Sequence, residues 1–321
     1  MTLTPSHELP HFTEADGFRA WRSNPVHWLP IARDIAHGHR ITGAAPQVFA
    51  NGTNLVVGLD DGLVLKIFPP LLRAQFVSER GALAQLGGRL SIPIPEVVAE
   101  GERDGWPYLI ITRLEGVLGS DVWPALAEAR KERVLREIGA IIAEVQRVPP
   151  GVLLELEPRW EVFMRAQIEG CRTRHQRLGL APKFLAGFDD LLRDAAELIP
   201  MDASPVILIG EYIPENFLLA CRNDEWSVAG LFDFGDVRTG WRDYDLLGPS
   251  AFMAAGRPGR VRSLFEGFGY GSADIDFALK RRLMALILLH HASDPVRHIC
   301  IADWQDKAND LVELQELIWP D

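Results

Sequence analysis

The hydrophobic pattern of this chain changes once, near Gly116, and that change limits the folds open to it. Between Pro46 and Phe68 the apolar residues form short runs of the kind that predict strands. Asp61-Gly62 separates two of these runs and predicts the turn of an antiparallel hairpin. After Gly116 the apolar spacing becomes helical. The sequence therefore predicts an α+β protein with a sheet-rich N-terminal lobe and a larger, mainly helical C-terminal lobe.

The N-terminal lobe is assigned to residues 1–113. A leading helix is predicted from Asn24-Pro25, where a capping residue precedes a proline in the first turn, to Gly38. A second helix begins near Leu72 and ends before Gly87-Gly88. Five strands are expected around the second helix, among them Leu55–Val57, Leu63–Leu65, Val97–Val98 and Tyr108–Thr112.

The C-terminal lobe is assigned to residues 114–321. Its helical pattern is interrupted once by short strands, and the loops between those strands are rich in Asp, Glu, Asn and Gly. Loops carried on a rigid scaffold are where catalytic residues tend to lie. The predicted helices are Asp121–Val148, Trp160–Leu178 and Phe184–Leu198, and the predicted strands are Val206–Ile209, Phe217–Leu219 and Val228–Phe234.

Composition and charge narrow the partners. With 321 residues the chain is long for one compact core, and two lobes with a cleft between them are expected. A formal net charge of −11 repels nucleic acid and anionic lipid and favours cationic ligands, although the same acidity can serve solubility alone. The sequence gives no oligomeric state.

The expected compartment is the cytoplasm. The three cysteines are odd in number and widely spaced, which fits neither a disulfide framework nor a metal ribbon. Met1 to Gly17 lacks the basic start and apolar run of a signal peptide. The most apolar stretch, Leu283–Leu289, is too short to span a bilayer.

Two motifs predict a metal-assisted reaction. In Leu231–Gly235 an apolar strand delivers Asp233 just before a glycine that permits a sharp turn. Upstream, Glu211 and Asn216 lie on one loop between two predicted strands, and Mg²⁺ prefers such oxygen ligands. Each motif alone is also typical of an ordinary turn. Their order and separation on paired strands favour a site in which Asn216 and Asp233 hold Mg²⁺.

A buried cation is predicted on the third strand run. Lys66 shares a strand face with Val64 and Phe68, and a cation there requires a partner or a bound anion. Glu79, between Phe76 and Leu83 in the following helix, can supply the partner carboxylate. The alternative is a lysine that extends to solvent and a solvated glutamate.

Two backbone segments can contact a nucleotide. Asn51, Gly52 and Thr53 lie between the first two strands, where backbone N–H groups and a hydroxyl can cover phosphates, although the segment taken alone, with its single glycine, favours an ordinary turn. The apolar strand that runs through Arg113 and Leu114 can offer its backbone to adenine.

Other catalytic chemistries find no support in the sequence. No pair among the nine histidines has further ligand residues at a spacing typical of a metal site. His290-His291, at the end of an apolar helix, is predicted to lie in the core or to line a cleft. A Gly-x-Ser-x-Gly elbow, as in serine hydrolases, does not occur.

The order of these parts resembles the aminoglycoside phosphotransferase family, which has a protein-kinase-like fold, over nearly the whole chain. Strand lysine, helix glutamate, hinge, catalytic loop and Asp-Phe-Gly are followed by an Asp-rich element at Trp241–Leu246. Trp28–Arg33, Lys66–Phe68 and Leu289-His290 are similar to the branch that phosphorylates hygromycin.

The resemblance implies a role for each matching residue. Lys66 would hold the α- and β-phosphates of ATP, with Glu79 orienting it, and Glu211 would occupy the position of the catalytic base. The family's catalytic loop normally reads His-Gly-Asp, four residues, then Asn, whereas here Ile209 replaces the His and Glu211 replaces the Asp. The added methylene matters because about 1 Å of misplacement can cost about 10²-fold in rate.

Three functions remain open at this point. The first is an O-phosphotransferase acting on an aminoglycoside-like or sugar-like acceptor, with Glu215 and Asp236 as candidate acceptor contacts. The second is a metabolite kinase of the same fold, acting on a sugar, choline-like or amino-alcohol substrate. The third is a nucleotide-binding protein in which Glu211 supports little turnover. The sequence does not distinguish ATP from GTP as the donor.

Overall fold

The computed structural model describes residues 8–41, 46–50, 52–59 and 62–321. Their contacts divide the chain into two compact units. The N-terminal unit contains the residues up to 87, residues 93–115 and the short segment 232–236. The C-terminal unit contains residues 88–92, 116–231 and 237–321. The segment around Asp233 therefore returns to the N-terminal unit, although the sequence analysis placed it with residues 114–321.

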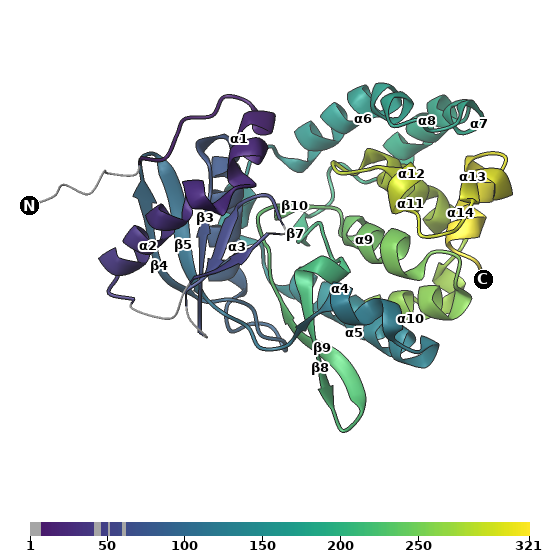
Figure 1. Ribbon diagram of the computed structural model, residues 1–321. Helices are drawn as coiled ribbons and strands as arrows, with labels where there is room; N and C mark the ends of the chain where they lie inside the picture. Colours follow the sequence, from purple (N-terminus) through teal and green to yellow (C-terminus); the bar gives the residue numbers. More distant parts are fainter. Residues whose placement is uncertain (1–7, 42–45, 51, 60–61) are drawn as a thin grey trace, which may run out of the picture. The chain divides into compact units, whose positions relative to one another are not determined.

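A five-stranded antiparallel sheet organises the N-terminal unit (Figure 1). The strands lie in the order β1-β2-β3-β5-β4, so the hairpin β2-β3 is central and β5 pairs with β3 before β4 closes the edge. Of the predicted hairpin turn Asp61-Gly62, Asp61 lies outside the described residues, and Gly62 directly precedes β3. The strands are β1 Gln47–Phe49, β2 Leu55–Gly58, β3 Leu63–Ile67, β4 Val97–Arg103 and β5 Trp106–Thr112.

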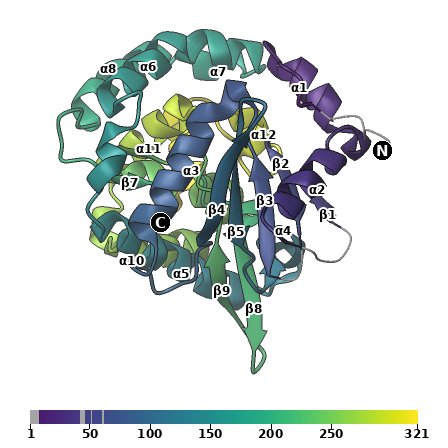
Figure 2. The ribbon, with the colours of Figure 1, turned by 90° about the vertical axis from the view of Figure 1, so that its left-hand side faces the viewer.

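Helices cover the two faces of this sheet (Figure 2). Helices α1 (Ala15–Arg22) and α2 (Leu29–Gly38) pack on one face, where strand residues such as Leu65 and Ile67 join the buried core. Helix α3 (Arg73–Leu86) lies on the other face. Because strand side chains alternate between faces, Lys66 points away from Leu65 and Ile67 and toward α3.

The start of the leading helix was predicted imperfectly. Asn24 does act as a cap, accepting from Val26 N–H at 3.2 Å, but it caps a 3₁₀ turn, Pro25–His27. The α-helix α2 begins only at Leu29. The preceding helix α1 was not predicted from the sequence: it has eight residues, and Phe18 is its one buried residue.

The C-terminal unit is mainly helical, as expected. Its two longest helices are α5 (Glu128–Arg147) and α6 (Trp160–Arg177). No helix among the described residues is both long and apolar enough to cross a membrane. The other α-helices are α4 Gly119–Val122, α7 Pro182–Leu185, α8 Phe188–Leu198, α9 Leu247–Pro249, α10 Pro258–Phe268, α11 Phe277–Leu289, α12 Pro295–His298, α13 Trp304–Lys307 and α14 Leu311–Ile318.

The predicted helix Asp121–Val148 is wrong as a single element. The chain forms α4, then a 3₁₀ turn at Trp123–Ala125, and only then α5. Pro124 explains the break, because its ring blocks the preceding turn and it offers no N–H to a helix. Helix α5 then packs closely on α10, where a Cβ at Gly139 would lie 2.2 Å from the Leu264 carbonyl oxygen.

Two small antiparallel sheets interrupt the helices and carry the polar loops. One has the order β6-β8-β9 and the other pairs β7 with β10. The loop between β7 and β8 contains Glu211 and Asn216. The strands are β6 Val117–Leu118, β7 Val206–Leu208, β8 Phe217–Arg222, β9 Glu225–Leu231 and β10 Arg238–Gly240. The α+β fold class predicted from the sequence is confirmed.

Candidate active site

A buried lysine lies between two carboxylates in the N-terminal unit. Lys66 Nζ donates to Glu79 Oε2 at 2.5 Å and to Asp233 Oδ1 at 2.7 Å. Lys66 is 5% exposed and Glu79 is 1% exposed, whereas the Asp233 side chain keeps 36% of its surface exposed. The Lys66–Glu79 pair is therefore a buried structural pair, and Asp233 is the member that still presents oxygen atoms to solvent.

Electrostatics in this cluster favour a charged Lys66 and a charged Asp233. Burial alone lowers the pKa of Lys66, but the charges of Asp233 and Glu79 outweigh burial and raise it. The Lys66 ammonium holds the pKa of Asp233 below its usual value. Burial, opposed by Lys66 and reinforced by Asp233, raises the pKa of Glu79 to about 7. One ammonium thus lies between two carboxyl groups, and Asp233 is the one that its charge keeps ionised.

The turn that presents Asp233 differs from the sequence prediction. The left-handed residue is Asp233 itself, with φ 67°, and not Gly235. At Gly235 the backbone approaches α3 closely, since a Cβ there would lie 3.3 Å from Gln75 Cβ. Aspartate tolerates the left-handed region better than most residues. The turn at Asp233 is therefore made by the aspartate backbone itself.

Gln75 links the predicted phosphate-covering loop to the Asp233 segment within this unit. Its side-chain oxygen accepts from Thr53 Oγ1 at 3.4 Å and from Asn54 Nδ2 at 3.0 Å. Its Nε2 donates to Asp236 Oδ1 at 3.4 Å. Sequence reasoning missed Gln75, because a half-buried glutamine in the first turn of a helix carries no signal of its own.

Arginine 22 holds the same loop from the other side. Its guanidinium donates to the backbone oxygens of Ala50, at 2.9 Å, and of Gly52. Gly52 adopts φ 97°, a conformation that favours glycine. Asn51, the third predicted member of the loop, lies outside the described residues.

The predicted hinge offers fewer backbone groups than expected. The N–H of Arg113 donates to the Gly62 carbonyl at 2.8 Å, and the Arg113 guanidinium lies over the Phe49 ring, 5.5 Å from its centroid. A nucleotide base would therefore meet the carbonyl of Arg113 or the backbone of Leu114.

In the C-terminal unit, Asp245 fixes the loop that carries Glu211. Its carboxylate accepts from Ile209 N–H at 3.1 Å and from Gly210 N–H at 2.8 Å. Gly210 has φ 87°, so the chain can turn sharply just before Glu211. At the far end of the loop, Asn216 Nδ2 donates to the Glu211 carbonyl at 3.1 Å. Both ends of the loop are thus tied down around Glu211.

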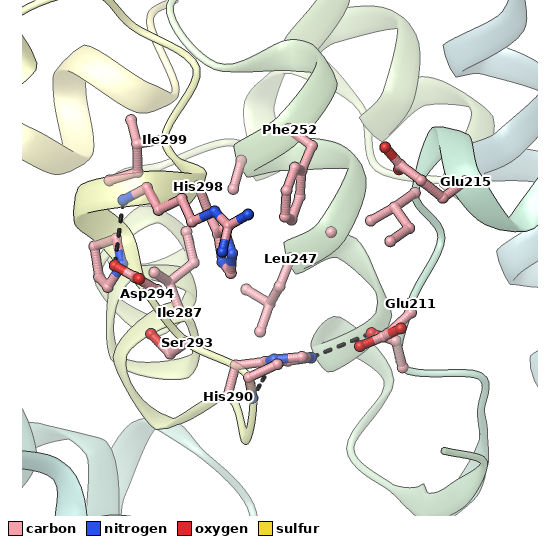
Figure 3. A pocket seen from close by; sticks show the side chains of 17 residues that line it. Glu211, Glu215, Leu247, Phe252, Ile287, His290, Ser293, Asp294, His298 and Ile299 are labelled. Carbon is pink, nitrogen blue, oxygen red and sulfur yellow. Dashed lines mark hydrogen bonds between the residues drawn. The ribbon is translucent and has the colours of Figure 1, made fainter. Parts of the chain in front are cut away.

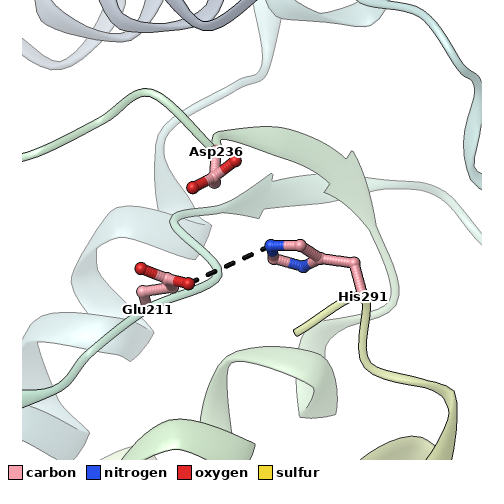
Figure 4. Close-up of side chains that lie close together, drawn as sticks. All are labelled: Glu211, Asp236 and His291. Carbon is pink, nitrogen blue, oxygen red and sulfur yellow. Dashed lines mark ion pairs between the residues drawn. The ribbon is translucent and has the colours of Figure 1, made fainter. Parts of the chain in front are cut away.

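The Glu211 side chain faces a histidine that follows α11 (Figure 4). His291 Nε2 lies 4.0 Å from Glu211 Oε1, and the other ring nitrogen of His291 lies 3.3 Å from the Tyr244 hydroxyl. Its neighbour His290 stacks on Tyr244 with ring centroids 4.7 Å apart and contacts the Gly210 carbonyl at 3.2 Å. The two histidines thus contact the loop that carries Glu211, His291 through the Glu211 side chain and His290 through the Gly210 carbonyl.

A pocket of about 420 Å³ opens beside this loop (Figure 3). Glu211 and Glu215 are among its lining residues. Tyr212 and Asn216, which belong to the same loop, are buried. The loop therefore presents its carboxylates to a space large enough for a small organic molecule.

Comparison with known proteins now identifies the family. Residues 45–280 match the model of the phosphotransferase enzyme family, which is well over half of the chain. The chain belongs to that family. The match begins before β1 and ends within α11, so it includes the Lys66 cluster, the Glu211 loop and Asp245 of this phosphotransferase.

Solved structures share the fold of this phosphotransferase at low sequence identity. The GDP complex of wild-type aminoglycoside 2'-phosphotransferase-IIIa is 18% identical with a TM-score of 0.65, covering 90% of this chain and 97% of that one. The GDP and kanamycin complex of APH(2")-IIia is 19% identical with a TM-score of 0.61, covering 81% and 89%. The macrolide 2'-phosphotransferase MphH from Brachybacterium faecium is 15% identical with a TM-score of 0.57, covering 80% and 90%. No curated protein matches the sequence.

The contact between Asp245 and the Glu211 loop should make the free energy of unfolding depend on pH. Burial, opposed by the N–H donors of Gly210 and Ile209, raises the pKa of Asp245 from 3.8 to about 7. The folded protein then binds this proton more tightly than the unfolded chain, so ionisation of Asp245 lowers stability as pH rises from about 4 to 7. We expect Asp245→Asn to destabilise the protein by about 1–3 kcal/mol at low pH, because its amide N–H₂ meets an N–H donor.

The destabilisation caused by Asp245→Asn should become smaller as the pH rises from about 4 to 7. The native protein loses stability over this range because Asp245 ionises, whereas Asn cannot ionise. Urea unfolding at pH 4.5 and 7.5 measures it. Asp310→Asn is the control, since Asp310 caps α14 and Asn is an equally good cap. A loss for Asp245→Asn that stays constant or grows between the two pH values contradicts the account.

Proposed function

We propose that this phosphotransferase transfers the γ-phosphoryl group of ATP to a hydroxyl group of a small, cationic molecule. The observation that carries the proposal is the Glu211 loop, which Asp245 and Asn216 hold at its two ends and which lines the 420 Å³ pocket. Family membership supports phosphoryl transfer. The acceptor and the individual residue roles are part of the proposal.

The proposed reaction is the displacement of ADP from the γ-phosphorus by the acceptor hydroxyl. The acceptor oxygen forms a bond to the γ-phosphorus, the bond from that phosphorus to the β–γ bridging oxygen breaks, and ADP leaves. Glu211 orients the acceptor hydroxyl for attack and accepts its proton as the new oxygen–phosphorus bond forms. Lys66 would bind the α- and β-phosphates, held in place by Glu79.

The oxygen donors of the two motifs fit Mg²⁺. Asp233 presents a partly exposed carboxylate, and the Asn216 side chain belongs to the loop of Glu211. When bound, Mg²⁺ would neutralise phosphate charge during transfer. GTP remains an alternative donor, since two of the similar structures are GDP complexes.

Aminoglycosides, including hygromycin, are the first acceptors to test. One structure of similar fold was solved with kanamycin, and the net charge of −11 favours cationic ligands. Trp28–Arg33, Lys66–Phe68 and Leu289-His290 support the hygromycin branch by their sequence. Activity of this kind would make the protein an antibiotic-resistance enzyme.

An acceptor screen tests the proposal. ADP release is measured with Mg²⁺-ATP and with Mg²⁺-GTP against aminoglycosides, macrolides, sugars and amino alcohols, and mass spectrometry identifies a product heavier by one phosphoryl group. Phosphorylation of a sugar or simple amino alcohol alone would favour the metabolite kinase. Nucleotide binding without any product would favour a nucleotide-binding protein in which Glu211 supports no turnover.

Mg²⁺-ATP is expected to raise the melting temperature of the protein. A ligand that binds only the folded state stabilises it by about 2.7 kcal/mol at a concentration 100 times its Kd. Asp233→Asn should remove the metal-dependent part of this shift, because the amide keeps the shape and the left-handed backbone but loses the charge. Asp303→Asn is the matched control, since Asp303 is also left-handed, with φ 51°. Equal shifts from ATP with and without Mg²⁺ in the native protein would exclude this metal site.

A further inference from the structure

The pocket beside the catalytic loop has an apolar floor (Figure 3). Leu247 on α9 and Ile287 on α11 are buried, and Phe252, in the π-helical segment Ser250–Ala254, is partly exposed. Ala251 and Ile299 complete this floor. A ligand that enters the pocket must therefore cover aliphatic and aromatic carbon.

Charge in the pocket is divided between two sides. Glu211 and Glu215 belong to the catalytic loop, whereas Arg297 and His298 belong to α12, and Figure 3 shows Leu247 and Phe252 between Glu215 and His298. Burial lowers the pKa of His298, which favours its neutral form.

Asp294 is the third carboxylate in the lining, and it bonds to its own helix. Asp294 accepts from the Arg297 N–H at 3.2 Å and caps α12. Two carboxylates on the catalytic-loop side therefore stand opposite one guanidinium.

This division does not suit a ligand with cations on every side. An ammonium placed against Leu247 or Phe252 would lose its water without gaining a partner, which is costly. An ammonium near Arg297 would meet a like charge. One amine close to the reacting hydroxyl, in contrast, can pair with Glu215 while the rest of the molecule covers the floor.

We propose that the acceptor is an amphiphilic amino alcohol, with one amine near the reacting hydroxyl at the Glu211–Glu215 side and an apolar body over Leu247, Phe252 and Ile287. The inference rests on the proposed phosphotransferase function and narrows its acceptor. It separates this acceptor from a polycationic aminoglycoside such as kanamycin by the chemistry of the pocket floor.

A homologous series of ligands tests the inference by binding alone. The probes are 2-(N-methyl-N-alkylamino)ethanols with alkyl chains of two to eight carbons, titrated calorimetrically into the full chain with Mg²⁺ and a non-hydrolysable ATP analogue. Each added methylene should lower Kd by about 2- to 4-fold until the floor is covered. Kanamycin should bind more weakly than the longest chain.

Two variants connect the gain to named residues. Phe252→Ala should reduce the gain per methylene by at least half, whereas the matched control Phe277→Ala should leave it unchanged, because Phe277 is 57% exposed at the start of α11 and does not line the pocket. Glu215→Gln should weaken all members of the series by a similar factor without changing the gain. That pattern would place the ligand's amine beside the loop that carries Glu215 and its alkyl chain on the apolar floor of the pocket.

The failure of the inference differs from the failure of the proposed function. If Kd is independent of chain length, if no member binds, or if kanamycin binds more tightly than the longest chain, the amphiphilic acceptor is overturned even if kanamycin is phosphorylated. An unchanged gain in Phe252→Ala also overturns it. If the series binds as expected but no member is phosphorylated, the pocket assignment stands and the phosphotransferase proposal fails.

Discussion

Replacing Glu211 with Gln is expected to lower kcat by about 10²-fold or more while leaving ATP affinity nearly unchanged. Gln preserves the size of the side chain but removes the charge that accepts the acceptor's proton. The loop geometry should survive, because Asp245 and Asn216 bind backbone groups of the loop and not the Glu211 side chain. Steady-state kinetics with a confirmed acceptor and calorimetric ATP titration measure the two effects separately.

Glu215→Gln is the matched control, made on the same loop. Glu215 is exposed and is proposed to contact the acceptor, so its replacement should raise KM for the acceptor and change kcat little. Glu211→Asp tests whether the length of the side chain matters. The shorter carboxylate would lie farther from His291, whose Nε2 is 4.0 Å from Glu211 Oε1 in the native protein. Unchanged turnover in Glu211→Gln would make Glu211 a structural residue and would require another base or none.

Replacing Lys66 with Met is expected to destabilise the protein by about 3–5 kcal/mol, besides abolishing phosphate binding. The Met side chain fills the space, but Glu79 is then a buried carboxylate beside Asp233 with no cation between them. Adding Glu79→Gln to Lys66→Met should recover part of the loss, because it removes a buried carboxyl group that must otherwise bind a proton or stand charged beside Asp233. Urea unfolding of the native protein, both single variants and the double variant gives the coupling energy.

Lys280→Met provides a control with similar burial. The Lys280 side chain is 4% exposed and also contacts two carboxylates, at 2.6 Å and 2.8 Å. Those partners, Glu316 and Asp321, keep 46% and 90% of their side-chain surface exposed, so water can solvate them after the lysine is lost. The loss should therefore be clearly smaller than for Lys66→Met. Equal losses would show that the burial of Glu79 is not the source of the effect.

Local sequence signals carried the fold class and much of the candidate site. The change from strand-like to helical spacing near Gly116 comes from side chains a few residues apart, so it can be read without any tertiary contact. Lys66 stood out because a cation on an apolar strand face requires a partner. Asp233 stood out because it directly follows a strand of apolar residues. Pro124, which breaks the predicted helix, is also a local signal, because proline disfavours a continuous helix whatever surrounds it.

Only the tertiary structure decided what surrounds these residues. Asp245 lies 36 positions from Ile209, and His290 lies 80 positions from Gly210, yet both contact the catalytic loop. The carboxylate pair of Lys66 includes Asp233, 167 positions away, because segment 232–236 returns to the N-terminal unit.

The apolar floor beneath Glu211 likewise draws on α9, the π-helical segment and α11. Periodicity reports which side of an element is buried, but it does not say which other element covers that side. The sequence by itself therefore determined the fold class, most of the elements and the candidate site residues of this chain, and long-range packing decided how its lysine and its loop carboxylate are held.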